Sequence, residues 1–365
     1  MSSFVNRYRA GMDAARDRWD ALPRPARWLV LLLVVVFFYA LPNIQIPGIV
    51  TTETDWATTL FTIAYYVLLA LGLNVVVGKA GLLDLGYVGF FALGAYTTAL
   101  LTSPDSDLGT KWGWLVTVPI AIGVVMVSGV LLGAPTLRLR GDYLAIVTLG
   151  FAEIIRVFAT ALPALRGQRG FGEIPHPPGQ KSDGLPLFGV IDTRPYYWLG
   201  LSLIIIVIFA VRNLDRSRVG RAWVAVREDE EAAEAMGVPT FKFKLWAFAI
   251  GAAIGGLSGT LFAGEQGFIN STNFALLFSI LVLAGVVLGG SGNIAGVIVG
   301  GALIAYLPER LRGLKIAGQD AFEYRFLFFG LILIIVMIFR PQGLIANRRR
   351  LQELKDREKE VIVGE

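Results

Sequence analysis

Few residues of this chain could carry out covalent or metal chemistry. The 365 residues include no Cys and a single His, His176, which lies in the Pro-rich stretch IPHPPG. Without Cys there is no thiolate nucleophile, disulfide or Cys-based metal site. One loop His favours neither a catalytic triad nor a histidine metal cluster. We therefore expect no catalytic residue, no metal site and no enzymatic activity.

Charged residues inside apolar stretches are the next candidates, because a charge within a membrane is costly. Glu153 and Arg156 are three residues apart and would meet on one face of a helix. They would form a structural ion pair inside the helical bundle or a polar patch on a transport pathway. Asp84 lies near a second apolar stretch. Asp84 is a weaker candidate for the same pathway, together with three uncharged polar residues: Asn74, Thr97 and Thr148.

A stretch from Gly72 to Ala80 superficially resembles a phosphate-binding loop. Five residues, instead of four, separate its two glycines, and Ala80 replaces the Ser or Thr that would hold magnesium. We expect the chain to hydrolyse no ATP and to hold no cofactor of its own.

These candidates must be positioned by membrane helices. Hydrophobic residues make up 55% of the chain, and the mean hydropathy is +0.62, which is typical of a multispan membrane protein. We expect an all-α, polytopic helical bundle of about eight to ten transmembrane helices, at about 20 apolar residues each. The predicted spans are 28–46, 57–77, 85–103, 114–134, 143–163, 196–211, 245–264, 275–289, 294–308 and 324–340.

Two glycine-rich stretches, 78–89 and 289–296, interrupt the apolar segments. The second must turn, because residues 275–307 as one helix would be about 50 Å long against a hydrocarbon core of about 30 Å. The turn makes either a tight hairpin or a span with a re-entrant piece. Paired interruptions often mark a substrate region, because they expose backbone polar groups. The candidate pathway glycines are Gly86, Gly89, Gly290 and Gly292.

The distribution of positive charge predicts the orientation. Of the 33 Lys and Arg residues, 23 fall on the segments that are cytoplasmic when the N-terminus is inside, and eight fall on the outer loops. This bias favours both termini in the cytoplasm and an even number of spans. We expect a cytoplasmic amphipathic segment over 1–27, a permease domain over 28–345 with a long outer loop at 164–195, and a charged cytoplasmic tail over 346–365.

The longest polar interval, 212–244, is predicted to be a basic cytoplasmic loop that carries a short exposed helix. The run Glu230–Met236 is rich in Ala and Glu, which favour helix, and Gly237 and Pro239 end it. Small Ala232 and Ala233 would let another protein approach closely, and the flanking acids would set its orientation. The alternative is a solvated loop that contacts nothing.

The spacing of Glu231, Ala232, Ala233 and Gly237 resembles the EAA-xxx-G loop of bacterial ABC-transporter permeases, which inserts into a cleft of the ATPase subunit. The longer family motif continues with I-x-L-P, which is missing here. More of the chain resembles permease subunits of high-affinity branched-chain amino-acid ABC transporters, of the LivM type. Four stretches carry that resemblance: 72–101, 137–158, 218–238 and 339–344.

The resemblance implies a multi-pass protein of the cell inner membrane, surrounded by lipid. The net charge of +5 does not suggest a nucleic-acid partner, and we expect none. It implies a second homologous permease, two ABC ATPase subunits that use ATP and magnesium, and an extracytoplasmic binding protein that delivers leucine, isoleucine or valine. The implied ATPase-coupling residues are Glu230, Glu231, Ala232, Ala233 and Gly237.

The outer loop departs from the family pattern, since residues 166–172 show no clear match to the usual T-G-G-S/T-x-G run. That departure leaves the outer-loop contacts and the exact substrate open. Two alternative functions also remain. One is a related ABC permease for urea or short amides. The other is an ion-coupled secondary transporter that needs no ATPase, with Asp84 and Glu153 as the coupling carboxylates.

Overall fold

The computed structural model of the chain describes residues 23–44, 55–108, 110–138, 142–180, 186–189, 192–312, 314–316, 319–340 and 342–345. It divides into two units, Met1–Val50 and Thr51–Glu365. Most of the expected amphipathic segment 1–27 and all of the tail 346–365 lie outside the described residues, so the expected division into three parts stays a prediction.

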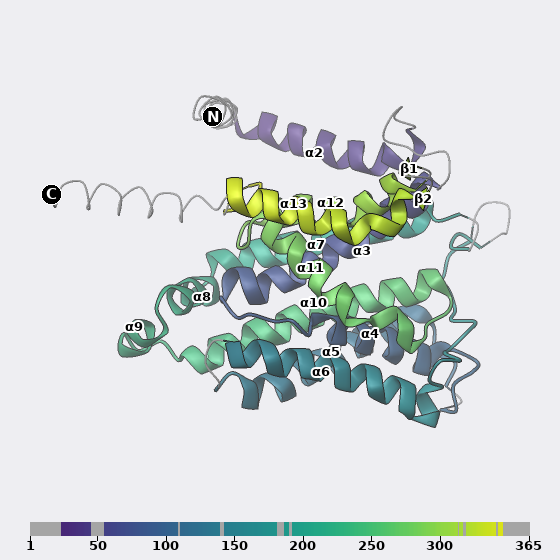
Figure 1. The fold of residues 1–365 in the computed structure, drawn as a ribbon, viewed down its shortest axis with the longest axis horizontal. Helices are drawn as coiled ribbons and strands as arrows, with labels where there is room; N and C mark the ends of the chain where they lie inside the picture. The colour runs from purple at the N-terminus through teal and green to yellow at the C-terminus, as the bar shows by residue number, and fades with distance from the viewer. Residues whose placement is uncertain are drawn as a thin grey trace. The chain divides into compact units, whose positions relative to one another are not determined.

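The all-helical prediction is confirmed, and Figure 1 shows the elements in chain order. The first unit contains α2 (Arg24–Ala40) and the short η1 (Leu41–Asn43). The second unit's transmembrane-type helices are α3 (Trp56–Leu73), α4 (Tyr87–Thr102), α5 (Trp114–Thr136), α6 (Asp142–Ala161), α7 (Arg194–Arg216), α10 (Thr240–Gln266), α11 (Leu276–Gly289), α12 (Ile294–Leu311) and α13 (Arg325–Phe339).

The remaining elements are short. They are η2 (Asn74–Lys79), η3 (Pro163–Leu165), α8 (Arg218–Glu228), α9 (Glu230–Ala235), η4 (Ser271–Phe274), the hairpin strands β1 (Lys315–Ile316) and β2 (Gln319–Asp320), and η5 (Ala321–Tyr324).

Each of the ten predicted spans corresponds to a helix. Eight of the described helices are long and apolar enough to cross a membrane. The other two, α4 and α11, have 16 and 14 residues, about 24 and 21 Å at 1.5 Å per residue. Each follows a segment without α-helix, residues 80–86 and 267–275, and the second of these segments includes η4.

Small residues allow α10 to pack closely at the centre of the second unit. A Cβ at Gly259 would lie 2.1 Å from the carbonyl oxygen of Phe91 in α4, and one at Gly256 would lie 2.7 Å from Val125 in α5. In lipid, where no hydrophobic force drives helices together, such close approach supplies the packing energy.

The two predicted interruptions are present. After α3 the chain passes into η2, a π-helix in which hydrogen bonds run to the fifth residue back, as from Ala80 N to Val75 O at 3.2 Å. Between α11 and α12 the chain turns at Gly290 and Gly292, with φ of +115° and +86°. Those angles favour glycine, because a Cβ would be strained there.

The long outer loop is tied to neighbouring loops. Phe171 and Ile269 exchange both backbone hydrogen bonds, at 2.9 and 3.0 Å, and both side chains are fully buried. Ser103 Oγ donates to the Gly172 carbonyl at 2.5 Å, and Arg166 pairs with Asp105 at 2.9 Å. The described part of this loop is therefore a packed structure.

Candidate coupling site

The polar interval 212–244 is more ordered than the predicted basic loop. The helix α7 continues to Arg216, and α8 occupies Arg218–Glu228, which sequence reasoning missed. The signal was available, because Gly220, Trp223 and Val226 recur at helical spacing between the arginines and are buried. Trp223 Nε1 donates to the Phe243 carbonyl of α10 at 2.8 Å, which anchors α8 against the bundle.

The short helix predicted at Glu230–Met236 is confirmed as α9, and Figure 1 shows it with α8 at one end of the second unit. Asp229 caps its start, because its Oδ1 accepts from Ala232 N at 2.9 Å. Gly237, at a φ of +84°, ends it, and the amide of Val238 donates back to the Ala233 carbonyl at 3.0 Å. The cap and the glycine fix both ends of a two-turn rod.

The surface of α9 corrects one expectation. Ala233 is only 5% exposed and packs against its own chain, so it does not face outward. Ala232 is exposed, as are Glu231 and Gly237. Met236 is 85% exposed, the highest value among the large hydrophobic side chains of the described residues. This side chain lies at the end of the capped helix, where no residue of its own chain covers most of its surface. Sequence reasoning counted Met236 only as part of the helical run.

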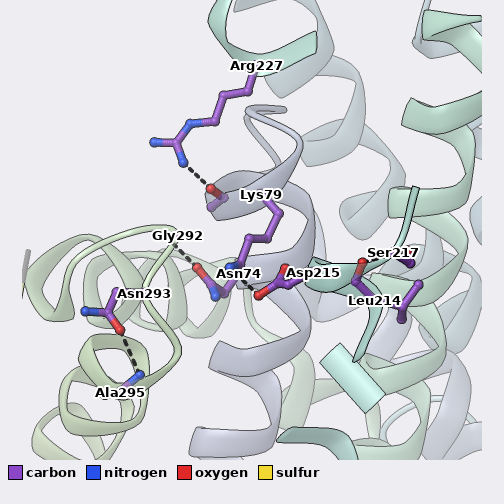
Figure 2. Close-up of polar contacts among 10 residues, drawn as sticks. Asn74, Lys79, Leu214, Asp215, Ser217, Arg227, Gly292, Asn293 and Ala295 are labelled. Carbon is purple, nitrogen blue, oxygen red and sulfur yellow. Dashed lines mark hydrogen bonds and ion pairs between the residues drawn. The ribbon is translucent and has the colours of Figure 1, made fainter. Parts of the chain in front are cut away.

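Two polar contacts connect α8 and α9 to the bundle, and a third joins η2 to α7. Glu230 Oε2 pairs with Lys244 Nζ of α10 at 2.5 Å. Arg227, in the last turn of α8, donates from Nη1 to the Gly78 carbonyl of η2. Lys79 Nζ of η2 pairs with Asp215 Oδ2 near the end of α7 at 2.6 Å (Figure 2). These side chains come from distant parts of the sequence, and only the fold brings them together.

The same π-helix also contacts the second interruption. Asn74 Oδ1 accepts from the backbone amide of Gly292 at 2.7 Å, and Figure 2 shows this bond beside the Lys79–Asp215 pair. Gly78 makes room for it, since a Cβ there would lie 1.9 Å from Asn74 Oδ1 and 2.5 Å from Gly292 N. The two glycine-rich interruptions therefore lie against each other.

We call this set of contacts the coupling joint. It consists of the bonds Arg227–Gly78, Lys79–Asp215 and Asn74–Gly292. The first bond joins α8 to η2, the second joins η2 to α7, and the third joins η2 to the turn between α11 and α12.

The other predicted pathway residues near the first interruption are closely packed. Asp84 is fully buried, and its Oδ1 accepts from Gly86 N at 2.8 Å. Thr148 Oγ1 accepts from Leu85 N at 3.1 Å. A Cβ at Gly86 would lie 1.7 Å from the Thr148 carbonyl oxygen, and one at Gly89 would lie 2.9 Å from Phe151. These residues hold α4 against α6.

Two further candidates are placed elsewhere. Thr97 Oγ1 donates to the Leu93 carbonyl of its own helix at 2.7 Å, and no hydrogen bond of the described residues joins it to the other candidates. Gly290 packs on the backbone after α13, where a Cβ would lie 2.5 Å from the Ile345 carbonyl oxygen. A role in substrate passage stays a prediction for all of these residues.

The predicted ion pair of α6 forms, but not inside this chain's bundle. Arg156 Nε lies 3.1 and 3.0 Å from the two carboxylate oxygens of Glu153. The side chains are 39% and 41% exposed, so the pair faces away from the helices of its own chain. The role of the pair, as a structural ion pair or as a polar patch on the pathway, stays a prediction, because helical spacing predicts that two residues share a face but not what that face meets.

The chain is similar to known transport proteins. A family model described as "Branched-chain amino acid transport system / permease component" matches residues 56–337. The chain is 40% identical to the "High-affinity branched-chain amino acid transport system permease protein LivM" of Escherichia coli K12, over 90% of this chain and 77% of that protein.

Two more relatives extend the comparison. The Salmonella typhimurium LT2 protein of the same name is 41% identical over 80% of this chain and 70% of its own length. The E. coli K12 "High-affinity branched-chain amino acid transport system permease protein LivH" is 24% identical over 77% of this chain and 91% of its own length. No solved structure matches the chain.

Proposed function

The chain belongs to the permease-component family of branched-chain amino acid transport systems, and we propose from this premise that it forms part of the membrane path of an ABC importer for leucine, isoleucine and valine. It is a multi-pass inner-membrane permease subunit and not an enzyme. Membership of an ABC family implies ATPase and binding-protein partners.

We propose the following composition for the complex. It contains a second, homologous permease chain, two ATPase subunits and an extracytoplasmic binding protein. The similarity of this chain to both LivM and LivH, two proteins with the same system name, supports a pair of related permeases. The ATPases would bind ATP and magnesium. No group of three or more His, Cys, Asp or Glu side chains suited to a metal ion occurs among the described residues of this chain.

The observation that carries the coupling proposal is the exposed α9 helix and its attachment to the coupling joint. Met236 and Ala232 form an exposed apolar surface that another protein can approach closely, and Glu231 and Glu234 lie beside it. An ATPase cleft that holds this rod would move it when nucleotide binds. The Glu230–Lys244 pair then passes the displacement into α10 at its first turn.

Through the coupling joint the same displacement acts on both interrupted segments. Arg227 pulls on the Gly78 carbonyl, and Asn74 carries the motion to Gly292. Interrupted helices rearrange more readily than continuous ones, because their backbone is not locked by one unbroken hydrogen-bond ladder. The expected result is alternate opening of the path towards the two sides of the membrane.

The test combines uptake with assembly. Cells without their own branched-chain system, which express this chain and its partner subunits, should accumulate labelled leucine. Excess isoleucine or valine should compete, and urea or acetamide should not. Uptake that persists without the ATPase subunits would contradict the proposal and favour an ion-coupled carrier.

A single substitution addresses the α9 contact. Met236→Asp should reduce the ATPase subunits that copurify with the chain by tenfold or more, because it removes a central apolar contact. Leu108→Asp, at an apolar residue 59% exposed in a loop at the opposite end, is the matched control and should leave copurification unchanged. Equal copurification of all three chains would place the ATPase contact elsewhere.

A further inference from the structure

The Glu153–Arg156 pair stands apart from every other charge on the described membrane helices. These two are the only charged residues of those helices that lie more than four positions from both helix ends. The helix α6 begins at Asp142, and Glu153 lies 11 residues further along it. At 1.5 Å per residue, Glu153 is about 17 Å along a span of about 30 Å. The pair therefore sits near the middle of the membrane.

The face that carries the pair is open along its length. Its exposed neighbours are large and apolar, and a Cβ at Gly150 would meet no atom within 4 Å. The exposed fractions are 64% for Ile146, 53% for Ile154 and 47% for Val157. A guanidinium and a carboxylate facing lipid at this depth would be costly, because hydrocarbon offers them no polar partner. The occupant that fits is protein, and the second permease chain of the proposed complex supplies it.

An interface between two permease chains is also where a solute could pass, since the coupling joint and the α4–α6 contact are filled with side chains. A free amino acid at neutral pH carries an ammonium and a carboxylate. Crossing the midplane requires a partner for each charge at the same moment. Glu153 and Arg156 are one anion and one cation, already in contact and facing outward.

We propose, on the basis of the proposed function, that the Glu153–Arg156 pair opens to receive the zwitterionic end of the transported amino acid. The Glu153 carboxylate accepts hydrogen bonds from the substrate ammonium, and the Arg156 guanidinium donates two to the substrate carboxylate. The exchange is charge-neutral, because one ion pair becomes two. Ile154 and Val157 lie beside it to contact an aliphatic side chain. When the substrate leaves, the pair closes and no charge is left without a partner.

Single substitutions give the first test. Glu153→Gln and Arg156→Gln should each lower labelled leucine uptake at least tenfold, while the ATPase subunits copurify in normal amount. The unaltered chain separates the two proposals: if it supports no leucine uptake, the proposed function fails, and if both variants transport normally, only this inference fails. Loss of copurified subunits in both variants would indicate a structural pair and overturn the inference.

A charge reversal separates a substrate-binding pair from a structural one. Glu153→Arg combined with Arg156→Glu keeps an ion pair at the same spacing but reverses its polarity. The double variant should assemble and still fail to transport, because the substrate charges meet like charges. Transport by the double variant would overturn the inference, and failure to assemble would also overturn it, because it would show a structural pair. The matched control is the same reversal at Glu309 and Arg312, another pair three residues apart, joined at 3.5 Å, which should retain uptake.

Discussion

Different kinds of contact stabilise the two ends of the second unit. At the α8–α9 end, charged and amide side chains make the coupling joint, and the Lys79 and Asp215 side chains keep 15% and 26% of their surface exposed. At the opposite end, backbone bonds tie the outer loop to residue 269, and fully buried aromatic rings, Phe171 and Phe274 among them, fill the space beneath.

This difference indicates which end can move. A partly hydrated ion pair or a single side-chain hydrogen bond contributes about 0.5–1.5 kcal/mol, so the bonds of the joint can exchange one at a time. Burying a Phe side chain contributes about 1.5–3 kcal/mol from apolar area alone, and the packed rings must separate together. We expect the outer loop to stay fixed while the joint rearranges during transport.

The largest effect should come from the outer end. Phe171→Ala should lower the free energy of unfolding by about 3–5 kcal/mol, because it removes a fully buried ring and leaves a cavity. Thermal unfolding of the purified complex measures this, and uptake per folded molecule should change little. Phe268→Ala, at a ring 43% exposed, should cost less than about 1 kcal/mol. A specific loss of uptake by Phe171→Ala would show that this end moves too.

The next effect concerns the joint itself. Gly78→Ala places a methyl group 1.9 Å from Asn74 Oδ1, so the bond to Gly292 must break. We expect at least tenfold lower leucine uptake with a stability loss of about 1–3 kcal/mol, typical of overpacking. Gly123→Ala, where nothing lies within 4 Å, is the control and should keep uptake and stability. Normal uptake by Gly78→Ala would remove the Asn74–Gly292 bond from the mechanism.

The smallest effects compare one ion pair from each end. A double-mutant cycle on Lys79→Met and Asp215→Asn should give a coupling energy of about 1 kcal/mol in thermal unfolding. The two charged groups are 2.6 Å apart, and their side chains are only 15% and 26% exposed to water that would screen them. The same cycle on Arg166→Gln and Asp105→Asn should give about 0–0.5 kcal/mol, because both side chains are more than a third exposed. Equal coupling energies would weaken the contrast between the two ends.

Local patterns in the sequence predicted the elements well. Apolar runs of about 20 residues predicted the spans, because a hydrocarbon core demands that length. An Ala- and Glu-rich run with Gly237 after it predicted α9, and the cap by Asp229 that the structure adds also involves only neighbouring residues. The turn at Gly290 and Gly292 was predicted because residues 275–307 are too long for one span, and the positive φ of both glycines fits it.

What the sequence could not decide was which faces meet. The spacing of Glu153 and Arg156 required a shared helix face, but only the packing of α6 shows that this face points away from the chain. Ala232 and Ala233 are the same residue type, yet Ala232 is exposed and Ala233 is buried, because α9 packs against its own chain on the side of Ala233. The contact of Asn74 with Gly292, across 218 residues, depends on how α3 and α12 pack. Capping and hydrophobic length act between neighbours in the chain, whereas these contacts depend on the relative positions of whole helices, which packing alone fixes.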